Sequence, residues 1–203
     1  DYKKYKSLAL RNGGNGYSYV QPRWRDMFIQ SLGDRMNLDR QMAQPVAFYL
    51  NGIFYGMMIL TERTNEDYVY HNYGLDEDEI DFLGVGYSCE AGTKEAYNVM
   101  IDYVSKSYTN DDFYDRLATM MDIDEYIDYQ ILEQYVGNTD WVSNNIKLWR
   151  KHDGGKFRWI LYDTDFGLSK ATSVDKDMIK FATEEKGVEA MWVLLRSCLR
   201  NED

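Results

Sequence analysis

Residues 135–169 read YVGNTDWVSNNIKLWRKHDGGKFRWILYDTDFGLS, and they contain the most informative motifs of the chain. It contains two short apolar runs typical of strands, at residues 146–150 and 157–162, separated by the polar turn His-Asp-Gly-Gly at residues 152–155. A short glycine-bearing loop between two such runs predicts a β-hairpin. We therefore expect a hairpin that lies between two helical regions.

Polar residues stand on both sides of this predicted hairpin. Asp140 and Asn145 precede it with the spacing Asp-x-x-x-x-Asn, and Asp163-Thr164-Asp165-Phe166-Gly167 follows it. A protein-kinase catalytic loop has this spacing, with the Asp acting on the substrate hydroxyl, the Asn binding metal, and an Asp-Phe-Gly downstream. Two carboxylates after an apolar strand also suit a hard divalent cation. An Asp-x-Asp at a strand end also occurs as a simple turn cap, so the order of the motifs carries the interpretation.

The size of the chain permits one sizeable core or two closely fused lobes, since 44% of its 203 residues are hydrophobic. The sequence contains no run of about 18 apolar residues, so it predicts no membrane span. It also lacks an initiating Met and a signal-like segment, and we expect a domain taken from a longer chain.

Charge and cysteine content exclude some partners. A formal net charge of −11 argues against nucleic acid or an anionic membrane, and a polyphosphate ligand would need a local cluster of basic residues. Cys89 and Cys198 form no zinc pattern with the two histidines, His71 and His152. We expect two buried thiols, with a disulfide as the alternative.

The first part of the chain predicts a strand, a turn and a helix. Residues 5–10 alternate as a strand, and the glycine-rich residues 11–16 end it, either as a plain loop or as a phosphate cradle. A helix is expected to begin at Pro22, a favoured first-turn residue. Four side chains at helical spacing are expected to face the core: Trp24, Met27, Phe28 and Leu32.

A hairpin follows, with strands at residues 46–50 and 53–61 around the strong turn signal Asn51-Gly52. The second strand leads to Glu62, which either pairs with a cation or is simply solvated at the strand end. Beyond it, the acidic run at residues 76–79 predicts a solvated loop.

The second half of the chain predicts helices. One helix begins at about Thr93, and another begins at Asp122, where Asp-x-x-Glu resembles a capping box. This second helix is expected to end at Gly137 and so to position the polar loop that follows. Its predicted core-facing residues are Ile127, Ile131, Leu132 and Tyr135.

The whole pattern predicts an α+β chain, and it resembles the CotH kinase family of atypical protein kinases, named for spore coat protein H. The resemblance covers most of the chain: Tyr5-Lys6-Ser7-Leu8 with Arg11-Asn12, the helix with Arg25, the Asn-Gly hairpin at residues 48–63, the segment 138–145, and Tyr-Asp-Thr-Asp at residues 162–165. It implies a kinase-like bilobed fold, with a small β-rich N-terminal lobe and a larger helical C-terminal lobe whose inserted β-hairpin carries the metal-binding carboxylates. We expect one domain over residues 1–203, with lobes at about 1–67 and 68–203 and a catalytic segment at 138–169.

The resemblance also implies functional roles. Asp140 matches the catalytic Asp, Asn145 and Asp163 match the metal ligands, and Asp165 is expected as a secondary ligand. The cofactor would be Mg²⁺ or Mn²⁺ with ATP as co-substrate, and the partner a protein with Ser or Thr hydroxyls. No V-A-I-K strand is present to hold the phosphates. The candidates for nucleotide binding are Lys6, Arg11, Arg25 and Glu62. Family resemblance suggests a spore-coat or extracellular cell-surface location.

Three other functions fit parts of the pattern. A metal-dependent glycosyltransferase also uses Asp-x-Asp after a strand, but it would need parallel β-α-β alternation before it. A phosphatase would carry the motif at the start of an α/β domain, and only 38 residues follow Asp165. A non-catalytic coat or surface module that keeps the fold for binding is the remaining alternative.

Overall fold

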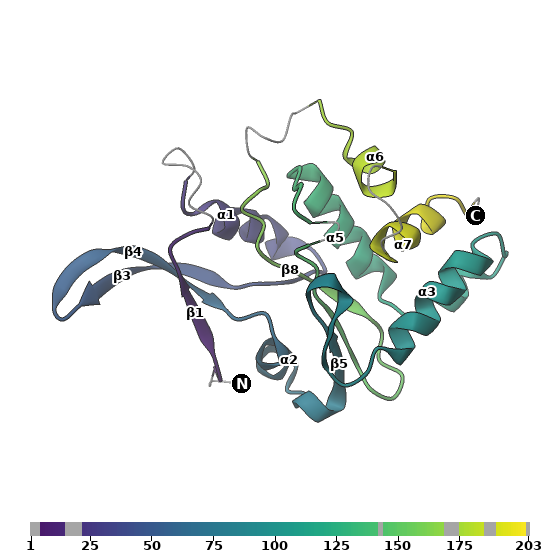
Figure 1. Ribbon diagram of the computed structural model, residues 1–203, viewed down its shortest axis with the longest axis horizontal. Coiled ribbons are helices and arrows are strands. Elements are labelled where there is room, and N and C mark those ends of the chain that lie inside the picture. Colours follow the sequence, from purple (N-terminus) through teal and green to yellow (C-terminus); the bar gives the residue numbers. More distant parts are fainter. Residues whose placement is uncertain (1–4, 15–21, 142–143, 169–174, 185–189, 202–203) are drawn as a thin grey trace.

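The computed structural model describes residues 5–14, 22–141, 144–168, 175–184 and 190–201. It is a mixed α+β structure with two sheets (Figure 1). The first sheet has the order β1-β4-β3, with β1 at Leu8–Arg11, β3 at Ala43–Leu50 and β4 at Ile53–Glu62. The second sheet has the order β2-β8-β7-β5-β6. Its strands are β2 (Asp39–Arg40), β5 (Ile80–Leu83), β6 (Cys89–Ala91), β7 (Leu148–Lys151) and β8 (Arg158–Leu161).

The helices lie around these sheets. They are α1 (Arg25–Leu32), α2 (Glu66–Tyr73), α3 (Glu95–Ser107), α4 (Phe113–Leu117), α5 (Ile123–Tyr135), α6 (Met178–Thr183) and α7 (Ala190–Cys198). Helix α5 packs against β8, and α3 packs against α7. The larger hydrophobic core gathers side chains from α3, α5, α7 and the second sheet, including fully buried Met100, Tyr129 and Leu148. Within the described residues, each helix is too short or too polar to cross a membrane.

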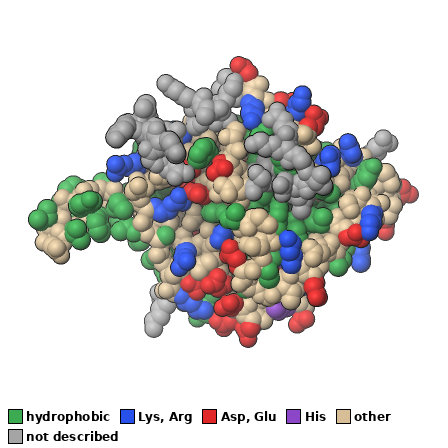
Figure 2. Space-filling view, in the orientation of Figure 1, with side chains coloured by type: hydrophobic (Ala, Val, Ile, Leu, Met, Phe, Trp, Pro, Cys, Tyr) green, Lys and Arg blue, Asp and Glu red, His purple; other side chains and the backbone are tan. Residues whose placement is uncertain are grey.

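The Asn51-Gly52 hairpin prediction is confirmed. Both turn residues have positive φ, 50° at Asn51 and 81° at Gly52, as a tight hairpin turn that follows the strand twist requires. The β3–β4 hairpin projects from the rest of the molecule (Figure 1), and hydrophobic side chains cover the projection (Figure 2). Ile53 is 73% exposed and Tyr55 is 72% exposed, so these side chains at the end of the hairpin lie outside the hydrophobic core.

The second predicted hairpin is also confirmed, because β7 and β8 pair antiparallel with Leu148 opposite Trp159. Its surroundings differ from the prediction of a hairpin inserted among helices. Strand β5 pairs with β7 on one side, and β2 pairs parallel with β8 on the other. The hairpin is therefore the centre of a five-stranded sheet, which fixes the end of β8 on both sides.

The predicted core faces of α1 and α5 are largely wrong. Trp24, just before α1, is exposed, as are Phe28 and Leu32 within the helix, while Asp26 is buried. In α5 the prediction holds for Leu132 alone; the exposed residues are Ile127, Ile131 and Tyr135, and the buried ones include Glu125 and Glu133. These polar side chains are buried because other elements supply hydrogen-bond partners, as when both Glu125 oxygens accept from the backbone N–H of Trp159.

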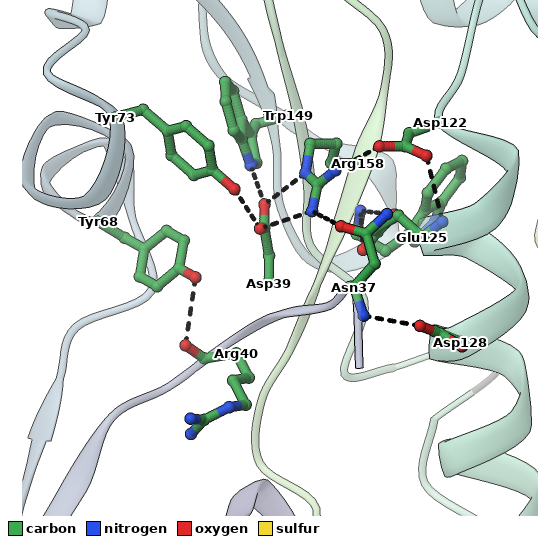
Figure 3. Close-up of polar contacts among 11 residues, drawn as sticks. Asn37, Asp39, Arg40, Tyr68, Tyr73, Asp122, Glu125, Asp128, Trp149 and Arg158 are labelled. Carbon is green, nitrogen blue, oxygen red and sulfur yellow. Dashed lines mark hydrogen bonds and ion pairs between the residues drawn. The ribbon is translucent and has the colours of Figure 1, made fainter. Parts of the chain in front are cut away.

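An ion-pair cluster around the buried Asp39 of β2 joins several elements (Figure 3). Its carboxylate, 5% exposed, accepts hydrogen bonds from the Tyr73 hydroxyl, from Trp149 Nε1 at 2.8 Å and from Arg158 Nη2 at 3.0 Å. Arg158 also pairs with Asp122, the N-cap of α5. The cluster therefore holds α2, β7, β8 and the start of α5 in one arrangement.

Both cysteines are free thiols, so the disulfide alternative is wrong. Cys89 is exposed, which corrects the expectation that both thiols are buried. Cys198 is partly buried, and burial raises the pKa of its thiol to about 12.

Candidate active site

The polar loop after α5 begins where the helix stops at Gly137, whose φ of 63° suits a glycine. The backbone N–H of Asn138 donates to the carbonyl of Glu133 at 3.1 Å, and the backbone N–H of Asp140 donates to the Asn138 side-chain oxygen at 3.1 Å. These two hydrogen bonds set the position of Asp140 relative to the helix end. The spacing motif continues through residues 142–143, which lie outside the described residues.

Asn145 connects Asp140 to the segment that follows β8. Its side-chain nitrogen lies 3.2 Å from Asp140 Oδ2 and 3.2 Å from the backbone oxygen of Asp163. Both contacts use the amide nitrogen, so the amide oxygen is the atom that would bind a metal. The structure thus brings together the three residues that the sequence singled out first.

Asp163 turns the chain away from the strand direction. Its φ of 52° is in the left-handed region, which Asp tolerates better than most residues. The alternation of side chains along an extended strand therefore does not apply to Asp163, Thr164 and Asp165. The orientation of this segment depends on contacts from α1 instead.

Helix α1 supplies those contacts through Asp26. One oxygen of the Asp26 carboxylate accepts from the backbone N–H of Thr164 at 2.9 Å and from its hydroxyl at 2.8 Å. The other lies 3.4 Å from Arg11 Nη1. Asp26 therefore joins β1, α1 and the Asp-x-Asp segment. Asp26 was not among the site residues predicted from the sequence, because an acidic residue in the first turn of a helix is expected simply to complement the helix dipole.

Two arginines reach the Asp-x-Asp segment. The guanidinium of Arg11 forms an ion pair with the Asp163 carboxylate, and Arg25 Nη1 donates to the backbone oxygen of Asp165 at 3.0 Å. Partial burial lowers the pKa of Arg11, but the hydrogen bond and charge of Asp163 outweigh this effect, so the pKa is raised. Arg11 therefore stays charged beside Asp163.

The glycine-rich turn packs against Asp165. A Cβ atom at Gly14 would lie 2.4 Å from Asp165 Oδ2, closer than real side chains approach, and the φ of 114° is also unfavourable for other residues. This close approach gives the turn a structural reason for its glycine. It leaves Asp165 only 8% exposed.

Lys6 and Glu62, the other two nucleotide-binding candidates, have different partners. The Lys6 ammonium lies 3.3 Å from Asp76 Oδ1 and 3.6 Å from the centre of the Tyr70 ring. The Glu62 carboxylate is buried and accepts from the backbone N–H of Met42 at 2.8 Å and from Asn72 Nδ2 at 3.2 Å. Arg11 and Arg25 thus contact the Asp-x-Asp segment, while Lys6 and Glu62 bond to residues outside that segment.

The donor set at this site fits a hard cation. Asp163 and Asp165 offer carboxylate oxygens, and Asn145 offers an amide oxygen. In the described part of the chain, no three His, Cys, Asp or Glu side chains gather closely enough to hold a metal by themselves. Mg²⁺ suits such a site, because it commonly takes one or two carboxylates and keeps waters and substrate phosphates as its other ligands.

An Asp in a helix-end loop, linked through an Asn to an Asp after a strand, is the polar arrangement of kinase-like proteins. The chain matches the family described as CotH kinase protein over residues 2–203, and it belongs to this family. A search of the curated proteins finds no match. Family membership confirms the resemblance read from the sequence and supports an atypical kinase function.

Proposed function

We propose that this protein is an ATP- and divalent-metal-dependent kinase that transfers phosphate to Ser or Thr hydroxyls of a protein substrate. The observation that carries the proposal is the pair of hydrogen bonds from Asn145 to Asp140 and to the Asp163 backbone. These bonds join a general-base candidate to a metal-ligand candidate. Phosphoryl transfer depends on positioning and charge neutralisation, so this small set of groups is sufficient.

Asp140 orients the substrate hydroxyl and accepts its proton as the oxygen attacks the γ-phosphorus of ATP, and ADP leaves. Asp163 and the Asn145 amide oxygen would hold Mg²⁺ or Mn²⁺, with Asp165 as a secondary ligand. When bound, the metal neutralises phosphate charge during the transfer. The other roles in the proposed transfer, binding and orienting the substrates and accepting the proton, belong to side chains of this protein.

Arg11 and Arg25 are the proposed phosphate-binding cations. Arg11 lies within hydrogen-bonding distance of the carboxylate that would hold the metal, which is where the phosphates of a metal–nucleotide would approach. A guanidinium matches phosphate geometry through its fork of N–H donors. Lys6 and Glu62 take no part in this proposal, because their partners are Asp76 and Met42 rather than the carboxylates after β8.

The proposed cleft follows from the same contacts. We assign the sheet β1-β4-β3 and α1, within about residues 1–67, to the smaller lobe of a kinase-like bilobed fold. Residues 68–203 form the larger lobe. Strand β4 pairs with β1, whose last residue is Arg11, so the hairpin at residues 48–63 borders the nucleotide site. By family, a spore-coat or cell-surface location is part of the proposal.

Two alternatives are distinguished by separate observations. A glycosyltransferase would need parallel β-α-β units, whereas the described sheets are antiparallel except for the two-residue pairing of β2 with β8. A non-catalytic binding module is favoured by the Arg11–Asp163 ion pair, because Arg11 already occupies the carboxylate that is proposed to bind the metal.

The experiment that tests the proposal is thermal unfolding with ATP and Mg²⁺ or Mn²⁺, followed by transfer of labelled phosphate to protein substrates. A nucleotide at 100 times its Kd should add about 2.7 kcal/mol to the free energy of unfolding. No stabilisation at millimolar nucleotide would favour the binding module. Stabilisation without transfer to any hydroxyl substrate would contradict the kinase assignment.

A further inference from the structure

Glu133 of α5 is a carboxyl group that the reaction does not use directly. Its side chain is fully buried, and its Oε2 accepts a hydrogen bond from Asn138 Nδ2 at 2.8 Å. Burial and the nearby charge of Asp26 raise its pKa to about 8, although the hydrogen bond from Asn138 lowers it. Glu is almost never fully buried without a specific partner, so this contact calls for a role.

Asn138 has two chemically different ends, and both are used. Its nitrogen donates to Glu133, and its oxygen accepts the backbone N–H of Asp140 at 3.1 Å. A side-chain amide rotated by a half turn would place its NH₂ group against that N–H, donor against donor. The bond to Glu133 and the bond from the Asp140 N–H therefore favour the same orientation of the Asn138 amide.

Burial and hydrogen bonds restrict the conformation of Asn138. The residue is fully buried, and its backbone N–H donates to the carbonyl of Glu133, so backbone and side chain are both held by one residue. Next to Asp140, the fully buried Trp141 anchors the far side of the loop. In the chain, Asp140 therefore lies between two buried residues, and its backbone N–H is bonded to one of them.

We propose that Glu133 is a positioning residue for Asp140, acting through the orientation of the Asn138 side chain. Its role in catalysis rests on the proposed kinase function, since Asp140 matters there as the group that orients the attacking hydroxyl. The positioning itself is a property of the loop, and it can be measured without any reaction. Errors of about 0.5 Å in the placement of a catalytic group are enough to reduce its effect.

The test compares Glu133→Gln with Glu133→Met in the full chain. Gln keeps an oxygen that accepts from Asn138, and Met fills a similar volume without an acceptor. A matched control is Glu125→Met, which removes an equally buried carboxyl of α5 that contacts β8 rather than the loop. Hydrogen exchange of the Asp140 backbone amide is measured by NMR against the amide of Leu132.

We expect Glu133→Met to accelerate exchange at Asp140 at least tenfold relative to Leu132, while Glu133→Gln and Glu125→Met leave this ratio within about threefold of wild type. In phosphotransfer, Glu133→Met should lower kcat at least tenfold at unchanged Kd for metal–ATP, and Glu133→Gln should restore it. Unchanged exchange in Glu133→Met, or equal acceleration in Glu133→Gln, would overturn the proposal.

The experiment distinguishes failure of the kinase function from failure of the positioning role of Glu133. If the wild-type protein transfers no phosphate, the kinase function fails, and the exchange ratio still decides whether Glu133 positions the loop. If exchange responds as expected and kcat does not, Glu133 holds the loop but does not position a catalytic Asp140, and the proposal in its catalytic form is overturned.

Discussion

Replacing Glu133 with Gln should remove a pH-dependent loss of stability, so that the variant gains stability relative to wild type as pH rises from 5 to 7. The pKa of this carboxyl rises from 4.5 in water to about 8 in its fully buried site. Between these two pH values the unfolded chain releases the proton while the folded chain retains it. The free energy of unfolding therefore falls as pH rises, by about 1.4 kcal/mol for each pH unit. Its contribution is fully present below pH 4.5 and is lost as pH rises to about 8.

The magnitude follows from that window. The wild-type protein should lose about 1 kcal/mol from this group by pH 5 and about 3 kcal/mol by pH 7. Gln does not titrate, and its side-chain oxygen still accepts from Asn138. The stability of Glu133→Gln relative to wild type should therefore increase by about 2–3 kcal/mol between pH 5 and pH 7.

Urea unfolding at pH 5, 6 and 7 measures this difference, and other titrating groups cancel between the two proteins. Glu133→Met is the control. Its stability should vary with pH in the same way as that of Glu133→Gln, because neither side chain titrates. It should be less stable than Glu133→Gln by about 1–3 kcal/mol at every pH, because Asn138 Nδ2 loses its acceptor. A difference between wild type and Glu133→Gln that stays constant from pH 5 to pH 7 would refute the reasoning.

Four further predictions follow from the site and the fold. Asp140→Ala should lower phosphotransfer by about 10²–10⁴-fold and leave metal–ATP binding, measured by calorimetry, nearly intact; transfer at the wild-type rate would end its assignment. Asp163→Asn should abolish most metal–ATP affinity in the same assay, and Asp165→Asn should cost less; the reverse order would make Asp165 the principal ligand. Arg11→Gln should weaken ATP binding and reduce its dependence on salt, and an unchanged Kd would remove Arg11 from the phosphate site. Asp39→Ala should destabilise the fold by about 1–3 kcal/mol in urea unfolding, since it removes the acceptor of Trp149 Nε1 and one of the two carboxylate partners of the partly buried Arg158; a smaller loss would contradict the described cluster.

Local signals predicted the parts of the fold that depend on a few neighbouring residues. Asn51-Gly52 predicted the turn between β3 and β4, because few residues adopt positive φ at low cost. Asp122 predicted the start of α5, where its carboxylate accepts the backbone N–H of Glu125. Gly137 predicted the end of that helix. In each case the chemistry lies within about four residues of the chain.

Periodicity was a poor guide to the buried faces of α1 and α5. Apolar spacing favoured burial of Phe28, Ile127 and Ile131, all of which are exposed. The structure buries Asp26 and Glu133 instead, because each meets a hydrogen-bond partner outside its own helix. Helix spacing cannot reveal such a partner, since the benefit of burying a carboxyl depends on what faces it.

The residues of the candidate site, Asp140, Asn145 and Asp163, could be predicted from the amino-acid order, together with the hairpin that separates them. The surroundings of these side chains depend on the tertiary fold. Arg11 meets Asp163 across 152 positions of the chain, and Asp26 meets Thr164 across 138. No local pattern encodes contacts of that range. They form because packing of the two sheets and α1 brings the segments together, and a charge in a partly buried site is stable only beside a partner.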